Sequence, residues 1–504
     1  MNAYIRLFRN TLFNISAYVV TGLVSFVTLP IMLRAFGQSV FGVYVISLSI
    51  AGMIALLDFG LITVLSKEVA QIAETNHDAT LARLVHLALF WLIAIGVLSA
   101  LVLWAIAYLP GLFSSLDESE LHLLRNMLLV QAVAQLFLWP CKTANVILIG
   151  KQSFGVISLA NLITALASAA IIVVVLIIGR GPVLIIALTS LMTFTVSGAL
   201  LIYAVRTYHT PLSLPSGSWF IPASQNLFRI AIPLFIVQIS AFLMQQQTDR
   251  LLLGLILGAT AVALYEVAAR IGTLVIQMVS LALSAFPPFV AHLDKHASRD
   301  EIAHFFLRTS RYLSFLVAPI LLVLVVLAPQ IIHLWVGDDF LTATLAMRLL
   351  TLSALYYPFL MAADSILIAR DKYHLWLPFA VVAALINLAL SFLLIRTYGL
   401  NGVAIATLCA SLFEGFAFLF VTRNVIGFTL RAWLAEVVVP ALVPSLIGAV
   451  TLGVFIYVFP ITSLAMLFFY FALACVLIYS LILAFSFTPR ERAQNFGHLR
   501  KHSS

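Results

Sequence analysis

Polar and charged side chains recur at helical spacing inside a segment, 260–289, that is otherwise apolar. Its stripe comprises Glu266, Arg270, Thr273, Gln277, Ser280 and Ser284. Successive members stand four or three residues apart, so an α-helix would carry them on one face. A charged side chain inside a membrane helix is costly and usually faces a partner or a water-filled cavity. The stripe therefore predicts a polar path through apolar surroundings.

Three further apolar segments carry polar stripes of the same kind. These are Asn14, Tyr18, Thr21, Ser25 and Thr28 in 12–34; Gln131, Gln135, Lys142 and Asn145 in 122–149; and Gln238, Gln245 and Asp249, beside Gln246 and Arg250, in 229–257. Hydrogen bonding between helices is the alternative explanation, because Ser, Thr and Asn make such bonds routinely in membranes. The charged groups on 229–257 and 260–289 favour a cavity. Together the four stripes predict one shared, water-filled cavity.

The cations and the neutral polar residues have different expected roles. Lys142, Arg250 and Arg270 are expected to bind an anionic group, and arginine suits phosphate because its guanidinium binds in a bidentate manner. The neutral residues expected to line the cavity are Asn14, Tyr18, Gln131, Gln135, Asn145, Gln238, Gln245 and Gln277.

Asp249, Glu266 and Asp364 are the acids expected to couple transport to an ion, because a carboxyl group within the membrane can carry a proton or a cation. Two alternatives stay open. Glu266 and Arg270 can pair on one helix face, since they are four residues apart, and Asp249 can neutralise a cation on a neighbouring helix. Asp58, in Asp58-Phe59-Gly60-Leu61, fits a structural role near a helix end better than a functional one.

Signatures of catalysis and of metal binding are missing from the sequence. It contains neither a Gly-x-x-x-x-Gly-Lys-Ser/Thr phosphate loop nor a His-Glu-x-x-His metal motif. His292 and His296 have metal-like spacing, but a solvated helix face explains them better. Cys141, Cys409 and Cys475 all fall in apolar segments and make no disulfide framework. We therefore expect no catalytic residue, no metal and no cofactor.

The elements that must position these residues are transmembrane helices. Of the 504 residues, 63% are hydrophobic and 9% are charged, a balance that cannot supply the surface of a soluble protein. Apolar stretches of about 20 residues or more have the length that crosses a bilayer as a helix. We count fourteen: 12–34, 41–66, 84–109, 122–149, 154–178, 183–205, 229–257, 260–289, 308–334, 342–369, 374–396, 401–422, 433–457 and 461–487.

Two short motifs recur at nearly one offset, which indicates duplicated halves. Gly37 and Tyr44 recur as Gly258 and Tyr265, 221 residues later, and Trp139-Pro140 recurs as Tyr357-Pro358, 218 residues later. Duplicated halves are a common plan of transporters that alternate access around a central site. We expect an N-terminal lobe of helices 1–6 over 1–213, a C-terminal lobe of helices 7–12 over 214–425, and helices 13 and 14 with a tail over 426–504.

The distribution of charge predicts the orientation in the membrane. If the N-terminus is cytoplasmic, most of the 27 Lys and Arg residues fall on the cytoplasmic side, as the positive-inside rule requires. The opposite loops hold Asp117, Glu118, Glu120, Asp338 and Asp339. Both termini are then cytoplasmic. The net charge of +8 is explained by this bias and by the anionic inner leaflet, without nucleic acid.

Four groups of short motifs follow one another along the chain. They are Leu29-Pro30 with Arg34-Ala35-Phe36-Gly37 and Phe41-Gly42-Val43-Tyr44; Leu57-Asp58-Phe59-Gly60-Leu61; Asp249-Arg250-Leu251-Leu252-Leu253-Gly254 with Gly258 and Tyr265; and Tyr398-Gly399-Leu400-Asn401-Gly402-Val403-Ala404. In their order and spacing these motifs resemble Wzx-type lipid-linked oligosaccharide flippases, the polysaccharide branch of the multidrug/oligolipid/polysaccharide (MOP) superfamily. Ala263 departs from the family, which usually has glycine before the tyrosine. The resemblance spans about residues 1–425.

The resemblance implies a flippase of the bacterial inner membrane. It would move an undecaprenyl-pyrophosphate-linked oligosaccharide, such as an O-antigen, capsule or exopolysaccharide unit, by alternating access driven by an H⁺ or Na⁺ gradient. The cations above would hold the pyrophosphate, the neutral stripes would contact the glycan, and membrane lipid would surround the acyl chain. A polysaccharide polymerase and other assembly proteins are the expected partners. Arg270 stands where the related peptidoglycan-precursor flippases have a cavity arginine, but Asn14, Tyr18 and Thr21 replace their cationic pair on helix 1.

Two other functions are alternatives to this one. A multidrug/cation antiporter of the same superfamily would have twelve spans and a more acidic, aromatic cavity. A membrane glycan polymerase or ligase would carry a large periplasmic loop with catalytic residues, and no connection here exceeds about 25 residues. The sequence therefore favours the flippase, which is not an enzyme.

Overall fold

The computed structural model describes residues 2–72, 78–215, 217–243, 246–283, 298–370 and 372–486. Throughout these ranges the secondary structure is helical, without any strand. Twelve helices within them are long and apolar enough to cross a membrane. The expected all-α membrane fold is thereby confirmed.

The difference between fourteen expected spans and twelve observed ones comes from two places. Helix α1 (Asn2–Ile54) contains the first predicted span and part of the second, and it departs from helical geometry at Gly37, where φ is 73° and ψ is 176°. A straight helix of that length would extend about 80 Å, far more than the roughly 30 Å of a bilayer core. The predicted span 229–257 falls on α8 (Phe220–Leu243) and α9 (Gln246–Ile256), on either side of residues outside the described ranges.

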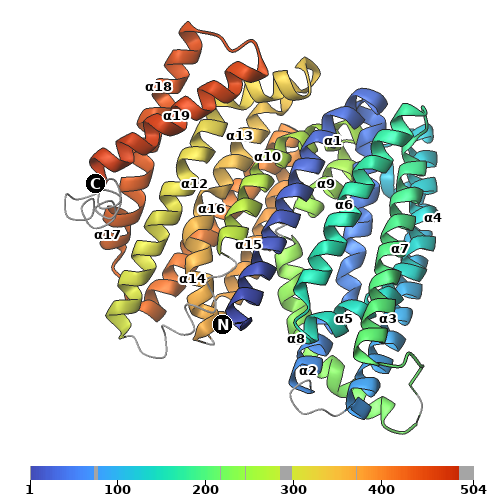
Figure 1. The fold of residues 1–504 in the computed structure, drawn as a ribbon. Helices are drawn as coiled ribbons and strands as arrows, with labels where there is room; N and C mark the ends of the chain where they lie inside the picture. Colours follow the sequence, from blue (N-terminus) through green and yellow to red (C-terminus); the bar gives the residue numbers. More distant parts are fainter. Residues whose placement is uncertain are drawn as a thin grey trace. The chain divides into compact units, whose positions relative to one another are not determined.

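The chain divides into two compact units, of which the first is Met1–Glu266. After α1 it contains η1 (Ala55–Asp58), α2 (Leu61–Ile72), α3 (Asp78–Ala107), η2 (Pro110–Phe113), α4 (Glu118–Cys141), α5 (Thr143–Gly150), α6 (Phe154–Ile177), α7 (Pro182–Tyr208), α8, α9 and the start of α10 (Ala259–Leu283). Figure 1 shows these helices running mostly alongside one another; α3 packs on α4, α1 on α6, α4 on α7 and α2 on α5.

Close approach of backbones fixes α1 against the α9–α10 hairpin. A Cβ on Gly42 would lie 1.9 Å from the carbonyl oxygen of Ala259, so only glycine fits there. A Cβ on Gly254 would lie 2.9 Å from Ile46 Cδ1. Small residues allow membrane helices to pack closely in this way. The second half of α1 therefore positions the hairpin that carries Asp249 and Glu266.

The second unit is Val267–Ser504. It contains the rest of α10, then α12 (Arg299–Trp335), η3 (Asp338–Ala343), α13 (Thr344–Leu352), η4 (Ser353–Tyr356), α14 (Tyr357–Ala369), η5 (Tyr373–Leu375), α15 (Leu377–Tyr398), α16 (Leu400–Ile426), α17 (Leu430–Trp433), the π-helical turn η6 (Leu434–Val438), α18 (Val439–Val458) and α19 (Leu464–Phe485). Within it α15 pairs with α16, and α18 packs on both α12 and α19.

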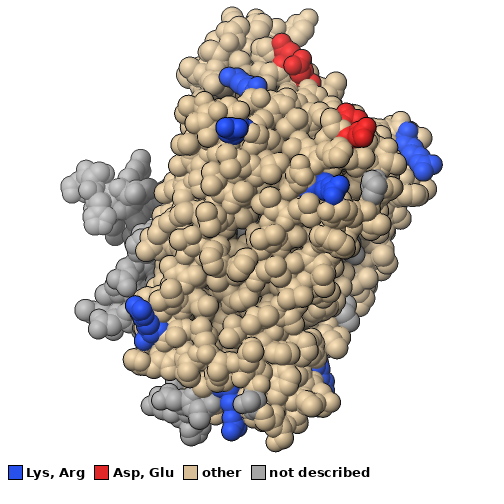
Figure 2. Space-filling model, turned by 90° about the vertical axis from the view of Figure 1, so that its right-hand side faces the viewer, with Lys and Arg blue, Asp and Glu red and all other residues tan. Residues whose placement is uncertain are grey.

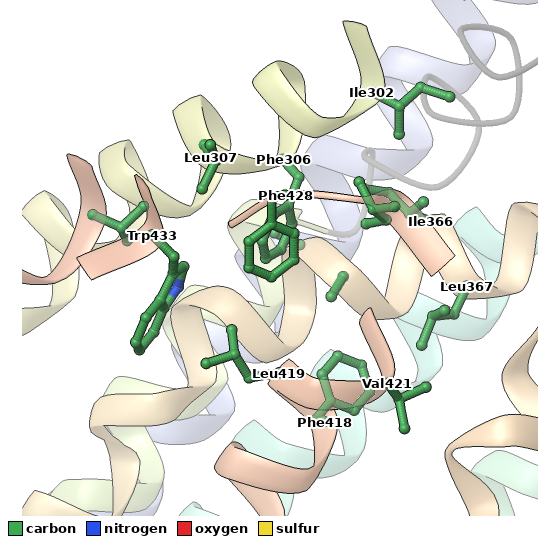
Figure 3. Packing of buried hydrophobic residues seen from close by; sticks show 14 of the residues in the cluster. Ile302, Phe306, Leu307, Ile366, Leu367, Phe418, Leu419, Val421, Phe428 and Trp433 are labelled. Carbon is green, nitrogen blue, oxygen red and sulfur yellow. The ribbon is translucent and has the colours of Figure 1, made fainter. Parts of the chain in front are cut away.

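An aromatic core holds the second unit together where α12, α14, α16 and α17 meet (Figure 3). The ring centroids of Phe306 and Phe428 are 4.9 Å apart, and Phe359 meets Trp433 edge-on at 5.3 Å. Aromatic pairs in such geometry add about 0.5–1.5 kcal/mol each beyond the area that they bury. The core anchors the start of α12 to the end of α16.

The outer surfaces are those of a protein surrounded by lipid. On α18 and α19, Tyr457, Phe468 and Phe485 are 89%, 69% and 78% exposed. The face drawn in Figure 2 carries its Lys, Arg, Asp and Glu side chains toward two opposite ends, with uncharged surface between them. An exposed apolar band bordered by charge is what a bilayer requires.

The residues that indicated a duplication coincide with irregular backbone. Gly37 interrupts α1 and Gly258 joins α9 to α10, with φ values of 73° and 88°. Pro140 lies at the end of α4, just before α5, and Tyr357 begins α14 directly after η4. The predicted lobes 1–213 and 214–425, and the segment 426–504, stay predictions.

Candidate functional site

The α9–α10 hairpin of the first unit holds an ion pair between two of the predicted site residues. Arg250 Nε lies 2.7 Å from Glu266 Oε2, and the two side chains are 13% and 3% exposed. The pair forms because the chain reverses at Gly258, whose φ of 88° favours glycine. The structure therefore gives Glu266 an ion-pair partner on α9, Arg250, that the sequence did not predict.

A second buried pair lies beside the first in the same hairpin. Tyr265 donates a hydrogen bond from its hydroxyl group to Asp249 Oδ2, and the residues are 0% and 2% exposed. The partners are 16 residues apart in both pairs, so the two pairs follow one register between α9 and α10. In the sequence, Tyr265 belongs to a repeat and to a family motif, but it was given no role in the site. Its equal spacing from the glycine in both copies of the repeat was the signal that could have tied it to Asp249.

Arg270 lies further along α10, in the part that belongs to the second unit, and it is partly buried. Gln277, two turns later on the same helix, is exposed. The backbone at Gly272 lies near the carbonyl of Leu350, since a Cβ on Gly272 would be 3.6 Å from that oxygen. Arg270 is thus carried by a helix segment that packs closely on α13.

Lys142 and Asp58 occupy breaks in two neighbouring helical stretches of the first unit. Lys142 stands between α4 and α5, with its Nζ 3.3 Å from the centroid of the Trp139 ring. Asp58 ends η1, accepts a hydrogen bond from the Gly60 N–H at 2.9 Å, and interacts electrostatically with Lys142. Phe59 has a φ of 48°, so the turn after Asp58 is left-handed. Asp58 thus lies at a helix end, where it holds the turn before α2, and it is also a neighbour of Lys142.

The neutral stripe residues lie at different depths. Gln131 on α4 is 5% exposed, and its Oε1 has no hydrogen-bond partner within the described residues. Gln135, Asn145 and Gln238 are half-buried on α4, α5 and α8. The side chains of Asn14, Tyr18 and Gln245 lie outside the part of the chain that the structure describes, as do His292 and His296.

Two acids lie in helices of the second unit, and one of them, Asp364, is a predicted site residue. Asp364 is half-buried on α14. Glu414 on α16 is 7% exposed and accepts a hydrogen bond from the hydroxyl group of Tyr356 on η4. The role of Tyr356 as a partner was not predicted from the sequence, in which only its neighbours Tyr357 and Pro358 drew notice. Among the described residues, no group of three or more His, Cys, Asp or Glu side chains could hold a metal ion.

Within the described residues, each unit carries charged side chains in otherwise apolar helices. Asp249, Glu266 and Glu414 are each held by a hydrogen bond or an ion pair. Such groups inside membrane helices usually face a partner or a water-filled cavity.

Solved structures with the same fold are membrane flippases and transporters. A lipid II flippase, MurJ, in its inward closed conformation superposes with a TM-score of 0.68 at 15% identity, covering 98% of this chain and 99% of that one. An inward-facing multidrug resistance MATE transporter of the MOP superfamily gives 0.62 at 16% identity, covering 83% and 94%. A MOP-superfamily transporter from Pyrococcus furiosus gives 0.54 at 16% identity, covering 84% and 95%.

Sequence comparison gives the family itself. No curated sequence matches the chain. The family model described as "Polysaccharide biosynthesis protein" matches residues 7–293, which is more than half of the chain. The matched region contains both pairs of the α9–α10 hairpin, Lys142 and Arg270. The chain is therefore a multi-pass membrane protein that belongs to the polysaccharide biosynthesis protein family and shares its fold with transporters of the MOP superfamily.

Proposed function

We propose that the protein moves an undecaprenyl-pyrophosphate-linked oligosaccharide, such as an O-antigen, capsule or exopolysaccharide unit, from the cytoplasmic to the periplasmic leaflet of the bacterial inner membrane by alternating access. The observation that carries this proposal is the likeness to a lipid II flippase over 98% of this chain and 99% of that one. The match to a family of polysaccharide biosynthesis proteins supports a glycan as the cargo.

The pyrophosphate is bound by Lys142, Arg250 and Arg270. A diphosphate carries several negative charges, and planar guanidinium groups bind its oxygens in bidentate fashion. Gln131, Gln135, Asn145 and Gln238 contact the glycan, together with Asn14, Tyr18, Gln245 and Gln277. The polyprenyl chain stays in lipid.

Coupling to an ion follows from competition for Arg250. In the structure its guanidinium is paired with the Glu266 carboxylate at 2.7 Å. An arriving pyrophosphate takes over the guanidinium, and the displaced carboxylate binds the coupling cation, H⁺ or Na⁺. The cation binds from the periplasmic side as the diphosphate leaves there, and its release into the cytoplasm, down its gradient, restores the pair. Asp249 and Asp364 are the other acids proposed for coupling.

The experiment that tests the function follows the lipid-linked glycan itself. A bacterial strain that lacks this protein should accumulate the lipid-linked oligosaccharide in the cytoplasmic leaflet, where periplasmic ligases cannot reach it. Restoring the full chain should return the glycan to the cell surface. Normal surface glycan in the deletion strain would contradict the proposal.

Arg270 provides the residue-level test. Arg270→Ala should abolish flipping, whereas Arg270→Lys should restore it only in part, because lysine keeps the charge and loses the bidentate fork. Arg396→Ala is the matched control, since Arg396 is an exposed arginine at the end of α15 in the same unit. Unchanged surface glycan in Arg270→Ala, at a normal protein level, would exclude the anion-binding role.

A multidrug/cation antiporter is the second candidate, because multidrug resistance transporters are among the matching structures. Efflux of cationic dyes from cells that express the chain distinguishes the two. An antiporter would lower dye accumulation in a way that depends on the ion gradient, while the flippase would leave it unchanged.

A further inference from the structure

A pocket of about 350 Å³ lies at the end of the first unit where α3 finishes and α4 begins. Tyr108, Phe113, Glu118, His122 and Arg125 contribute to its lining. None of the residues proposed to bind the flipped substrate belongs to it. The pocket therefore needs an explanation of its own.

In this pocket Arg125 packs on an aromatic ring, that of Tyr108. Its Cζ lies 4.0 Å from the centroid of the Tyr108 ring, and the side chain is half-buried. Among the described residues, no acceptor of a hydrogen bond from Arg125 is found, and none of its neighbours forms an ion pair with it. A guanidinium that is stacked in place with its N–H groups unused is preorganised for an oxyanion such as phosphate.

Of the three acids at the start of α4, Asp117 and Glu120 already accept hydrogen bonds. Asp117 caps α4 by accepting a hydrogen bond from the Glu120 N–H at 2.8 Å. Glu120 in turn accepts hydrogen bonds from the Asp117 N–H and from Ser39. Glu118 lines the pocket, and within the described part of the chain its carboxylate neither accepts a hydrogen bond nor forms an ion pair. The pocket thus contains one available carboxylate as well as one available guanidinium.

These two charges are ordered along the axis of α4. Glu118, His122 and Arg125 are spaced by four and three residues, which places them on one helix face. At about 1.5 Å per residue, Arg125 lies roughly 10 Å further into the membrane than Glu118. A ligand that bridges them needs an anionic group on the membrane side and a cationic group on the water side.

An apolar track leads to the pocket from within the membrane. Val97, Leu101, Trp104 and Tyr108 on α3 and just after it follow one face and are 45%, 58%, 54% and 45% exposed. The rings of Trp104 and Tyr108 are 5.1 Å apart. Trp and Tyr residues at the membrane–water interface characteristically lie at the level of lipid headgroups. A hydrocarbon chain along this track brings its headgroup to Tyr108 and Arg125.

We propose that this pocket is a binding site for a zwitterionic aminophospholipid, that is, a phosphatidylethanolamine-type lipid. Its phosphate binds Arg125 and His122, its ammonium group binds Glu118, and an acyl chain lies along Leu101 and Trp104. A purely anionic headgroup would place negative charge near Glu118, and a polyprenyl phosphate has no amine for that carboxylate. The proposal does not depend on the flippase function, because it concerns a lipid that is bound and not one that is transported.

Native mass spectrometry of the full chain in mild detergent tests the site. The protein is titrated with equal amounts of phosphatidylethanolamine and phosphatidylglycerol, and retained lipid is counted. Arg125→Ala should weaken retention of phosphatidylethanolamine about tenfold or more, because hydrogen bonds to charged groups are lost. Glu118→Gln should abolish the preference for phosphatidylethanolamine over phosphatidylglycerol while keeping lipid retention.

Control variants make the result decisive. Arg180→Ala removes an exposed arginine between α6 and α7, outside the pocket, and should behave like the wild type. Arg125→Lys keeps the charge and should retain part of the binding, which separates loss of the site from loss of folding. The proposal is wrong if Arg125→Ala retains lipid as Arg180→Ala does. It is equally wrong if undecaprenyl phosphate displaces phosphatidylethanolamine at equal concentration and Glu118→Gln has no effect, since the pocket would then belong to a polyprenyl lipid.

Discussion

At the scale of single residues, the buried Arg250–Glu266 pair makes a definite energetic prediction. Glu266→Gln removes the carboxylate charge that pairs with the Arg250 guanidinium, and removal of one partner from a buried pair costs about 3–5 kcal/mol. The double variant Arg250→Met with Glu266→Gln removes both charges and should recover most of that loss. Thermal unfolding in detergent measures all three proteins. Equal stability of the Glu266→Gln variant and the wild type would mean that water or another group already satisfies Arg250.

The sequence predicted which polar residues share a helix face, but it did not predict their partners. Asp249 and Glu266 were recognised as acids on stripes, and the structure places both in the α9–α10 hairpin. Helical spacing reports on one helix at a time, whereas the pairing of Arg250 with Glu266 depends on the register between two helices. That register is set by the turn at Gly258, and helical spacing carries no information about the geometry of a turn. Tyr356 was missed for the same reason, because its partner Glu414 lies 58 residues away.

At the scale of elements, the contact between α1 and the start of α10 predicts that a methyl group added at Gly42 destabilises the protein, whereas one added at a glycine outside the contact does not. Gly42→Ala would bring a Cβ within 1.9 Å of the Ala259 carbonyl oxygen, so the backbones must separate. Overpacking of this kind typically costs about 1–3 kcal/mol. Gly198→Ala in α7 is the matched control, since its Cβ would meet nothing within 4 Å, and it should be neutral or stabilising by up to about 1 kcal/mol. Melting temperatures of the two variants compare the sites directly; the same shift in both would exclude this contact as the cause.

The start of α4 should respond to pH through its cap. Hydrogen bonds from the Glu120 N–H and from Ser119 lower the pKa of Asp117 below the usual aspartate value. A carboxyl whose pKa is lower in the folded state stabilises the protein above its unfolded pKa, and this contribution disappears as pH falls through the folded pKa. Asp117→Ala should therefore lower the melting temperature at pH 7, and the difference from the wild type should vanish when pH falls below the folded pKa. A difference that stays constant down to that pH would assign the loss to packing.

At the scale of the whole molecule, the predicted topology can be tested by labelling. In a variant without Cys141, Cys409 and Cys475, a cysteine at Ser114, which is exposed before α4, should react with an impermeant thiol reagent added to intact spheroplasts. A cysteine at Thr207, exposed at the end of α7, should react only after the membrane is opened. This follows from the excess of Lys and Arg on the cytoplasmic side. The reverse pattern would invert the proposed direction of transport.

The fold class was predictable because length and hydropathy, which are local properties of the sequence, identify membrane helices. The continuity of α1 was not, since a segment of 53 residues with an interruption at Gly37 reads either as one helix or as two. The same limit applies to 374–396, whose first residues form η5 and whose helix α15 begins only at Leu377. Hydropathy detects apolar stretches, but it cannot fix where backbone hydrogen bonding is interrupted.

The lengths of the outer helices imply a preference for one bilayer thickness. Helices α15 and α19 each have 22 residues, and α6 has 24. At about 1.5 Å per residue they extend roughly 33–36 Å, slightly more than the roughly 30 Å of a typical hydrocarbon core. Helices of this length fit a typical core with a modest tilt, and thinner membranes impose a cost for every ångström of hydrophobic mismatch. The acyl-chain length of the surrounding lipid therefore sets the hydrophobic mismatch at the lipid-facing helices, independently of any charged residue.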